Sequence, residues 1–150
     1  MGSVLELVTA CPRRELAAGA VLLEQGQASA PLLVLLSGEV EVLRDEVRVA
    51  RTSERGAVFG EMSALLGTTC TATVRALTPA AVAVVETPEA FFRSSPDAAL
   101  FVARLLAHRL DALNRYLVDV KAQYEGHDHL GMVDDVLDTL MHRQPRIAPH

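Results

Sequence analysis

Hydrophobic and polar residues follow short strand-like patterns through the first half of the chain. Leu32–Leu36 is a continuous apolar run, which is typical of a strand buried on both faces. In residues 40–44 apolar and polar side chains alternate, and turn residues such as Ser37-Gly38 and Asp45-Glu46 separate the segments. Further strands are expected at 20–24, 47–50, 71–76 and 81–86. Short strands divided by turns at this spacing predict a mainly β protein.

Helical patterns flank these strands. Residues 3–10 have apolar positions at helical spacing and end at Pro12, after which Arg13–Gly19 is expected to form a loop. After Thr87-Pro88 the pattern predicts a short helix over 89–93. A long helix over 97–125 then begins at Ser95-Pro96-Asp97, since serine is a favoured N-cap.

The long helix carries apolar residues at steps of three and four, as in a coiled coil. The positions are Ala99, Ala103, Leu106, Leu110, Leu113, Leu117, Val120 and Tyr124. The strands of a single chain need less cover than so long a seam provides, which favours pairing with a second copy of the chain. Packing of the helix along the strands of its own chain is the alternative. Gly126 is expected to end this helix, a further short helix is expected within 126–144, and 145–150 form a tail.

Size and composition indicate one soluble domain with an acidic surface. The chain has 150 residues, a formal net charge of −5 and two cysteines that form no CxxC pair. An acidic chain is a poor general binder of nucleic acid, which would need a basic patch. Its apolar runs are shorter than the ~18 residues of a membrane span, and it opens with no signal-peptide pattern. We therefore expect a reduced, cytoplasmic protein that binds neither DNA nor membrane.

Catalytic and metal-binding motifs are not evident. The sequence has no GxSxG, HExxH or P-loop pattern, so we expect no enzyme activity. His127-Asp128-His129 and His142 could suggest zinc, but such a loop at a helix break is usually solvated, and no metal site is expected.

The most informative stretch is residues 59–74, FGEMSALLGTTCTATV. Gly60 allows a backbone with positive φ and close approach to a ligand. A helical turn over Glu61–Ala64 would present N–H groups and the positive end of a helix dipole, which together bind anions. Thr71 adds a hydroxyl, and the Glu61 carboxylate could accept from sugar hydroxyls. One compact segment could therefore hold a phosphate and a ribose.

This stretch resembles the phosphate-binding cassette of the cyclic-nucleotide-binding domain family, which includes catabolite activators and the regulatory subunit of protein kinase A. The matching positions are Phe59, Gly60, Glu61, Met62, Leu65, Leu66, Thr71, Ala72, Thr73 and Val74. Thr69-Cys70 stand where the family has Pro-Arg, and that arginine normally pairs with the cyclic phosphate. A redox role for Cys70 is a lesser alternative.

The resemblance implies an eight-stranded β-roll, or jelly-roll, over residues 1–96, with an N-terminal helix and glycine turns at Gly38 and Gly56. It implies cyclic AMP or cyclic GMP as ligand and no required cofactor. The nucleotide-binding residues it implies are Phe59, Gly60, Glu61, Met62, Ser63, Ala64, Cys70, Thr71 and Ala72. Asn114 lies about where related activators contact the purine from the dimer helix, although a solvated role is the simpler interpretation.

We accordingly expect a regulatory domain that forms a homodimer through 97–125 and signals through its helices to a downstream protein. A single helix after residue 126 leaves no room for the family's winged helix-turn-helix, so DNA binding is not expected. The alternative is a degenerate member of the fold that acts as a dimeric interaction module without nucleotide.

Overall fold

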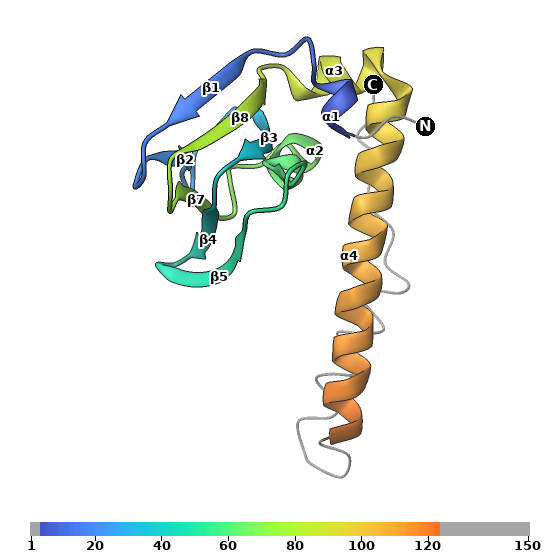
Figure 1. Cartoon of the computed structure of the whole chain (residues 1–150). Helices are drawn as coiled ribbons and strands as arrows, with labels where there is room; N and C mark the ends of the chain where they lie inside the picture. The colour runs from blue at the N-terminus through green and yellow to red at the C-terminus, as the bar shows by residue number, and fades with distance from the viewer. Residues whose placement is uncertain (1–3, 124–150) are drawn as a thin grey trace. The chain divides into compact units, whose positions relative to one another are not determined.

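The computed structural model describes residues 4–123. In this part of the chain eight strands form two antiparallel sheets, with strand orders β1-β8-β3-β6 and β2-β7-β4-β5 (Figure 1). The strands are β1 (Arg13–Leu16), β2 (Val21–Leu23), β3 (Leu32–Ser37), β4 (Val40–Arg44), β5 (Val47–Thr52), β6 (Val58–Phe59), β7 (Thr73–Ala76) and β8 (Ala80–Val85). The helices are α1 (Val4–Leu7), α2 (Glu61–Leu66), α3 (Pro88–Ser94) and α4 (Pro96–Gln123). The expected eight-stranded roll with flanking helices is thus confirmed.

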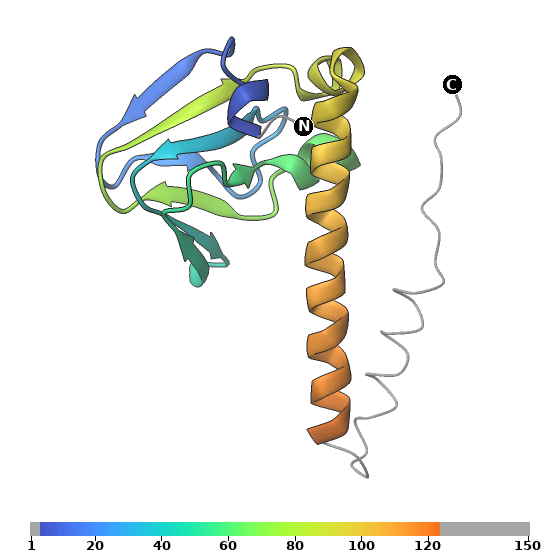
Figure 2. The same cartoon turned by 45° about the vertical axis from the view of Figure 1, so that its right-hand side comes forward.

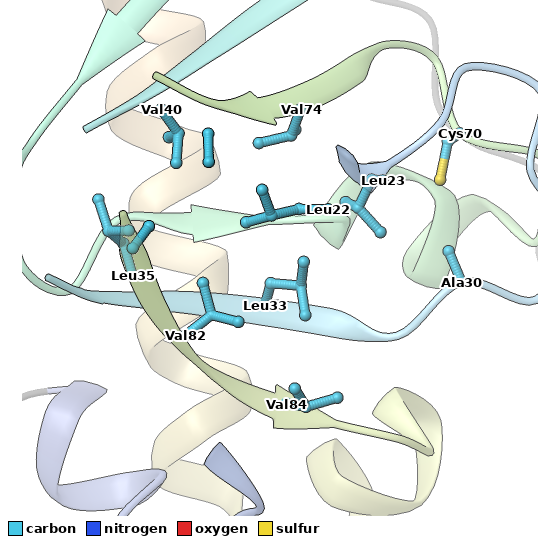
Figure 3. Close-up of a cluster of buried hydrophobic side chains, with 12 residues drawn as sticks. Leu22, Leu23, Ala30, Leu33, Leu35, Val40, Cys70, Val74, Val82 and Val84 are labelled. Carbon is cyan, nitrogen blue, oxygen red and sulfur yellow. The ribbon is translucent and has the colours of Figure 1, made fainter. Parts of the chain in front are cut away.

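The core lies between the two sheets. Leu33 and Leu35 of β3 and Val82 of β8 face Val40 and Val74 of the other sheet (Figure 3). Successive strand residues point to opposite faces, yet every residue of β8 is buried. Both faces of β8 are therefore covered, the one toward the core and the one away from it. Apolar surface outside the roll comes from three buried residues next to or within helices, namely Val8, Ala98 and Val102. Helix α1 contacts β3.

Glycine turns close the roll where the resemblance implied them. Gly38 and Gly56 both have positive φ, 91° and 97°. A Cβ atom at Gly38 would lie 2.5 Å from the backbone oxygen of Pro79. Only glycine therefore fits between β3 and β4, where the chain passes close to the turn before β8.

Three parts of the predicted pattern differ from the structure. Arg13–Leu16 was expected in a loop but forms β1, which pairs with Ala80–Ala83 of β8. Its residues show no apolar alternation because they are largely exposed, and backbone pairing alone makes them a strand. The described part of the N-terminal helix, Val4–Leu7, ends before the expected residue 10, and the two-residue β6 was not predicted.

Ser95 begins α4 as expected. Its hydroxyl accepts a hydrogen bond from the Ala98 N–H at 3.3 Å, and Pro96 occupies the first helical position, where its missing N–H costs nothing.

By packing, the chain divides into two units, Met1–Val102 and Ala103–His150. The first turns of α4 belong to the first unit. In the second unit Leu110, Leu113, Tyr116 and Val118 are exposed.

The predictions for Gly126, the helix within 126–144 and the tail at 145–150 lie outside the described residues. No described helix combines the length and apolar composition needed to cross a bilayer.

Candidate functional site

The start of α2 is shaped by Gly60. This residue follows β6 and has φ 89° and ψ 3°, the left-handed region. A Cβ atom there would lie 2.7 Å from the backbone oxygen of Pro31, so neither the conformation nor the space suits another residue. The Ala64 N–H donates to the Gly60 carbonyl at 3.1 Å. Helix geometry then gives the N–H groups of Met62 and Ser63 no acceptor within α2.

The end of α2 is equally defined. Gly67 is left-handed, with φ 68°, and its N–H donates to the Ser63 carbonyl at 2.9 Å. The Thr68 N–H donates to the same oxygen at 3.3 Å. These bonds close a helix of six residues, which includes the helical turn expected over Glu61–Ala64.

Ser63 and Cys70 connect α2 to the strand that follows it. The Ser63 hydroxyl donates to the Gly60 carbonyl at 3.2 Å, and its oxygen lies 3.9 Å from the Cys70 sulfur. The backbone of Cys70 is held on both sides, because its N–H donates to Gln27 and its carbonyl accepts from Gly26. The segment 60–70 is therefore tied to the turn at 26–27.

The candidate residues differ in exposure. Buried are Glu61, Ser63 and Cys70; half-buried are Phe59, Gly60, Ala64, Ala72 and Asn114; exposed are Met62 and Thr71. Thr71 lies two residues before β7, so the strand that we expected to begin there begins at Thr73 instead. Asn114 lies on α4 in the second unit, and its contact with a purine stays a prediction.

The family model of the cyclic nucleotide-binding domain matches residues 13–94. That range covers more than half of the chain, including both sheets and the whole of α2. The chain belongs to the cyclic nucleotide-binding domain family. A search of curated protein sequences finds no match.

Solved structures of this family share the fold. The catabolite activator protein of Thermus thermophilus is 25% identical with a TM-score of 0.62, over 93% of this chain and 80% of that one. A cyclic-nucleotide domain of a protein kinase A regulatory subunit, bound to Sp-2Cl-cAMPS, is 19% identical with a TM-score of 0.60, over 73% and 74%. The regulatory subunit of a cAMP-independent protein kinase A from Trypanosoma brucei is 26% identical with a TM-score of 0.50, over 54% of this chain but only 30% of that one.

The correspondence of Cys70 to the family's arginine stays a prediction, but the surroundings of this residue in the cyclic nucleotide-binding domain are well defined. Its side chain is only 6% exposed and belongs to the hydrophobic core. Figure 3 shows the sulfur pointing into the roll on the side of Ala30. A small side chain thus fills core space at this position.

A hollow of about 320 Å³ lies beside α2. It is lined by Ser29, Ala30, Ser63, Ala64, Gly67, Thr68, Glu86, Pro88 and Glu89. Two carboxylates and the carbonyl end of α2 give this hollow the wrong sign for a phosphate. A phosphate is better served at the other end of the helix, next to Gly60. Among the described residues, no group of His, Cys, Asp and Glu side chains is arranged to hold a metal ion.

Glu41 forms a charged cluster that the sequence did not reveal. Its side chain is 3% exposed, and its two oxygens accept from Nε and Nη2 of Arg48 and of Arg75. Hydrogen bonds from Arg48, then from Arg75, hold the pKa of the Glu41 carboxyl below its usual value. The partners lie seven and 34 residues away along the chain, and only the strand pairing brings them together.

Proposed function

We propose that this protein is a sensory domain that binds cyclic AMP or cyclic GMP and regulates another protein. The observation that carries the proposal is the left-handed Gly60 at the start of α2 within the matched family domain. Because the Pro31 carbonyl leaves no room for a Cβ atom at Gly60, the backbone holds the following amides in position. A ligand that binds these amides would require such a fixed arrangement.

The cassette would hold the ligand mainly through its backbone. The N–H groups of Met62 and Ser63 would donate to the cyclic phosphate, and the exposed Thr71 hydroxyl would add a further donor. Glu61 would accept from the ribose 2′-hydroxyl. A cyclic phosphate carries a single negative charge, which the roughly half-unit positive charge of a helix N-terminus partly balances.

Loss of the arginine weakens this site without removing it. A hydrogen bond to a charged group contributes about 1.5–3 kcal/mol, and each ~1.4 kcal/mol changes the affinity tenfold. The buried Cys70 thiol offers no replacement charge. We therefore expect a dissociation constant about ten to a hundred times larger than that of the same site with arginine.

The helices would complete the site and transmit the signal. The seam along α4 would pair two copies, and Asn114 would meet the purine near this dimer helix. Ligand would favour one arrangement of helices through its differential affinity for it. A downstream protein would read that arrangement. In this proposal the domain is cytoplasmic, catalyses no reaction, and acts without DNA or membrane.

Calorimetric titration tests the proposal. Wild-type protein is titrated with cyclic AMP and cyclic GMP, in parallel with Cys70→Arg and with Cys70→Ser as the uncharged control. We expect wild type and Cys70→Ser to bind alike, and Cys70→Arg to bind more tightly. No heat and no thermal shift at millimolar ligand for the wild type would refute nucleotide sensing by the natural protein.

The second candidate is an interaction module that binds no nucleotide. The inward-facing Cys70 sulfur favours it, as does the similarity to a kinase regulatory subunit described as cAMP-independent. In this case only Cys70→Arg would bind nucleotide, and the helices would carry dimerisation or docking. A hydrolysis assay on both cyclic nucleotides separates either candidate from an enzyme.

A further inference from the structure

The outer face of the sheet β2-β7-β4-β5 carries a charged and apolar patch. Val40 and Val42 of β4 point toward the core, so Glu41 between them points outward. Residues paired across strands share a face. Arg75 lies opposite Glu41 on β7, and Arg51 lies opposite it on β5. The outward patch is formed by Val21, Glu41, Leu43, Arg48, Arg51 and Arg75.

The two arginines that cover Glu41 are held in place but remain accessible. Each donates Nε and Nη2 to one oxygen of the buried carboxylate. Their side chains are nevertheless 49% and 45% exposed. The Nη1 group of each guanidinium takes no part in this pairing. Because folding has already ordered both side chains, a ligand that meets their outer edges would not need to immobilise them.

The charge of the patch is positive although the chain as a whole is acidic. The negative charge of Glu41 offsets the positive charge of only one of its two arginine partners. Glu39 lies at the long distance of 4.0 Å from Arg51, so it pairs weakly with that arginine. A net charge of −5 over the chain repels polyanions such as nucleic acid, whose binding depends on several phosphate contacts. A single carboxylate group, which needs one well-placed pair of guanidinium groups, fits this surface better.

Apolar surface adjoins the arginine pair. Val21 lies directly opposite Arg75 in the β2–β7 pairing and is 46% exposed, and the partly buried Leu43 lies opposite Arg48. Arginine is enriched at protein interfaces, and the adjoining apolar side chains offer surface that a partner could cover. In both views the β4–β5 hairpin, drawn in teal, projects from the rest of the roll (Figures 1 and 2).

We propose that this outer face is a docking surface for an acidic segment of a partner protein. A partner carboxylate binds the outer edges of Arg48 and Arg75, and apolar side chains beside it pack on Val21 and Leu43. Glu41 acts as a positioning residue that holds the two guanidinium groups at the right separation. None of the patch residues lies within the cassette segment 59–74.

The test uses an extended peptide in which leucine and glutamate alternate at every second position, with serine between them. Both side chains then lie on one face of the peptide. Its binding to the whole chain is measured by fluorescence anisotropy, and arginine Nε–H resonances locate the contact. The control peptide carries glutamine in place of glutamate. Single removal of an arginine would leave one oxygen of the buried Glu41 carboxylate without its donor, so the test variant is Glu41→Gln/Arg48→Gln/Arg75→Gln.

The matched control variant is Arg14→Gln, an exposed residue of β1 in the other sheet, which lowers the net charge by the same one unit. We expect the triple variant to bind the acidic peptide at least about tenfold more weakly, because charge-assisted hydrogen bonds are the strong ones. Arg14→Gln and wild type should bind it alike, with shifts at Arg48 and Arg75.

No binding by wild type at millimolar peptide, equal binding of the glutamine peptide, or equal binding by the triple variant would overturn the proposal. A DNA oligonucleotide that competes equally well, or self-association of the wild type that the triple variant abolishes, would also overturn it.

Discussion

At the scale of single residues, Gly60 and Gly67 frame the cassette helix in different ways. Both have positive φ, but only at Gly60 would a Cβ atom meet a backbone oxygen, that of Pro31. The left-handed conformation alone costs a non-glycine residue about 1–2 kcal/mol. At Gly67 nothing lies within 4 Å of such a Cβ atom. An alanine there would therefore meet only the cost of the left-handed conformation, without a steric clash.

We therefore expect Gly60→Ala to lower the free energy of unfolding by more than the ~1–2 kcal/mol that backbone strain predicts for Gly67→Ala. Gly60→Ala should also abolish nucleotide binding, because the amides of α2 move when the clash with Pro31 is relieved. Urea denaturation and calorimetry measure the two effects. Equal stability and equal affinity of the two variants would show that the contact with Pro31 does not shape the site.

Glu41 makes stability depend on pH. Because Arg48 and Arg75 lower its pKa in the folded state, its ionised form favours folding. This contribution is complete above the pKa of the unfolded chain, about 4.3, and is lost as the pH falls through the lower folded-state value. Glu41→Gln should thus be less stable than wild type at neutral pH, and the difference should shrink in acid.

Urea denaturation of both proteins from neutral pH to below pH ~4 measures this difference, since other titrating groups are common to the two. Glu39→Gln is the control, because Glu39 lies at the 4.0 Å limit from Arg51 and is partly exposed. A constant difference between wild type and Glu41→Gln at every pH would contradict the account of the cluster.

At the scale of secondary-structure elements, the cap of α4 is a defined local contribution. The Ser95 hydroxyl accepts from the Ala98 N–H, whereas the neighbouring Ser94 hydroxyl only donates to the Phe91 carbonyl. Ser95→Ala should lower the free energy of unfolding by about 1 kcal/mol. Ser94→Ala, on the exposed last turn of α3, should change it by less than about 0.5 kcal/mol. Chemical denaturation distinguishes the two serines, and equal effects would argue against the cap.

The sequence predicted elements well where burial shapes composition. β3 was recognised from its unbroken apolar run, and the start of α2 from Gly60 and the residues after it. β1 was not, because its exposed residues carry no alternation and only pairing with β8 makes it a strand. In the site, the positions of Gly60 and Ser63 followed from motif spacing. The inward direction of Cys70 and the Glu41 cluster depend on packing and strand register, which single-residue patterns do not contain.

At the scale of the whole molecule, the proposed function requires two copies of the chain. Leu110 and Leu113 lie on the predicted seam and are exposed within the chain. Sedimentation velocity should show a dimer for the wild type and a monomer for Leu113→Asp, because a charge in a coiled-coil seam is costly. Ala112→Asp adds the same charge to the same turn beside the seam and should leave the dimer intact. A wild-type monomer, or equal behaviour of both variants, would argue against this seam.

The central claim is that backbone amides at the start of α2 hold a cyclic phosphate without the family's arginine. Backbone amide resonances of the wild-type protein, recorded during titration with cyclic AMP and with cyclic GMP, test it most directly. The account predicts saturable shifts for at least one of the two nucleotides, largest at residues 60–64 and at Thr71. Unchanged resonances at millimolar nucleotide, or shifts confined to the acid-lined hollow near Glu86 and Glu89, would contradict it.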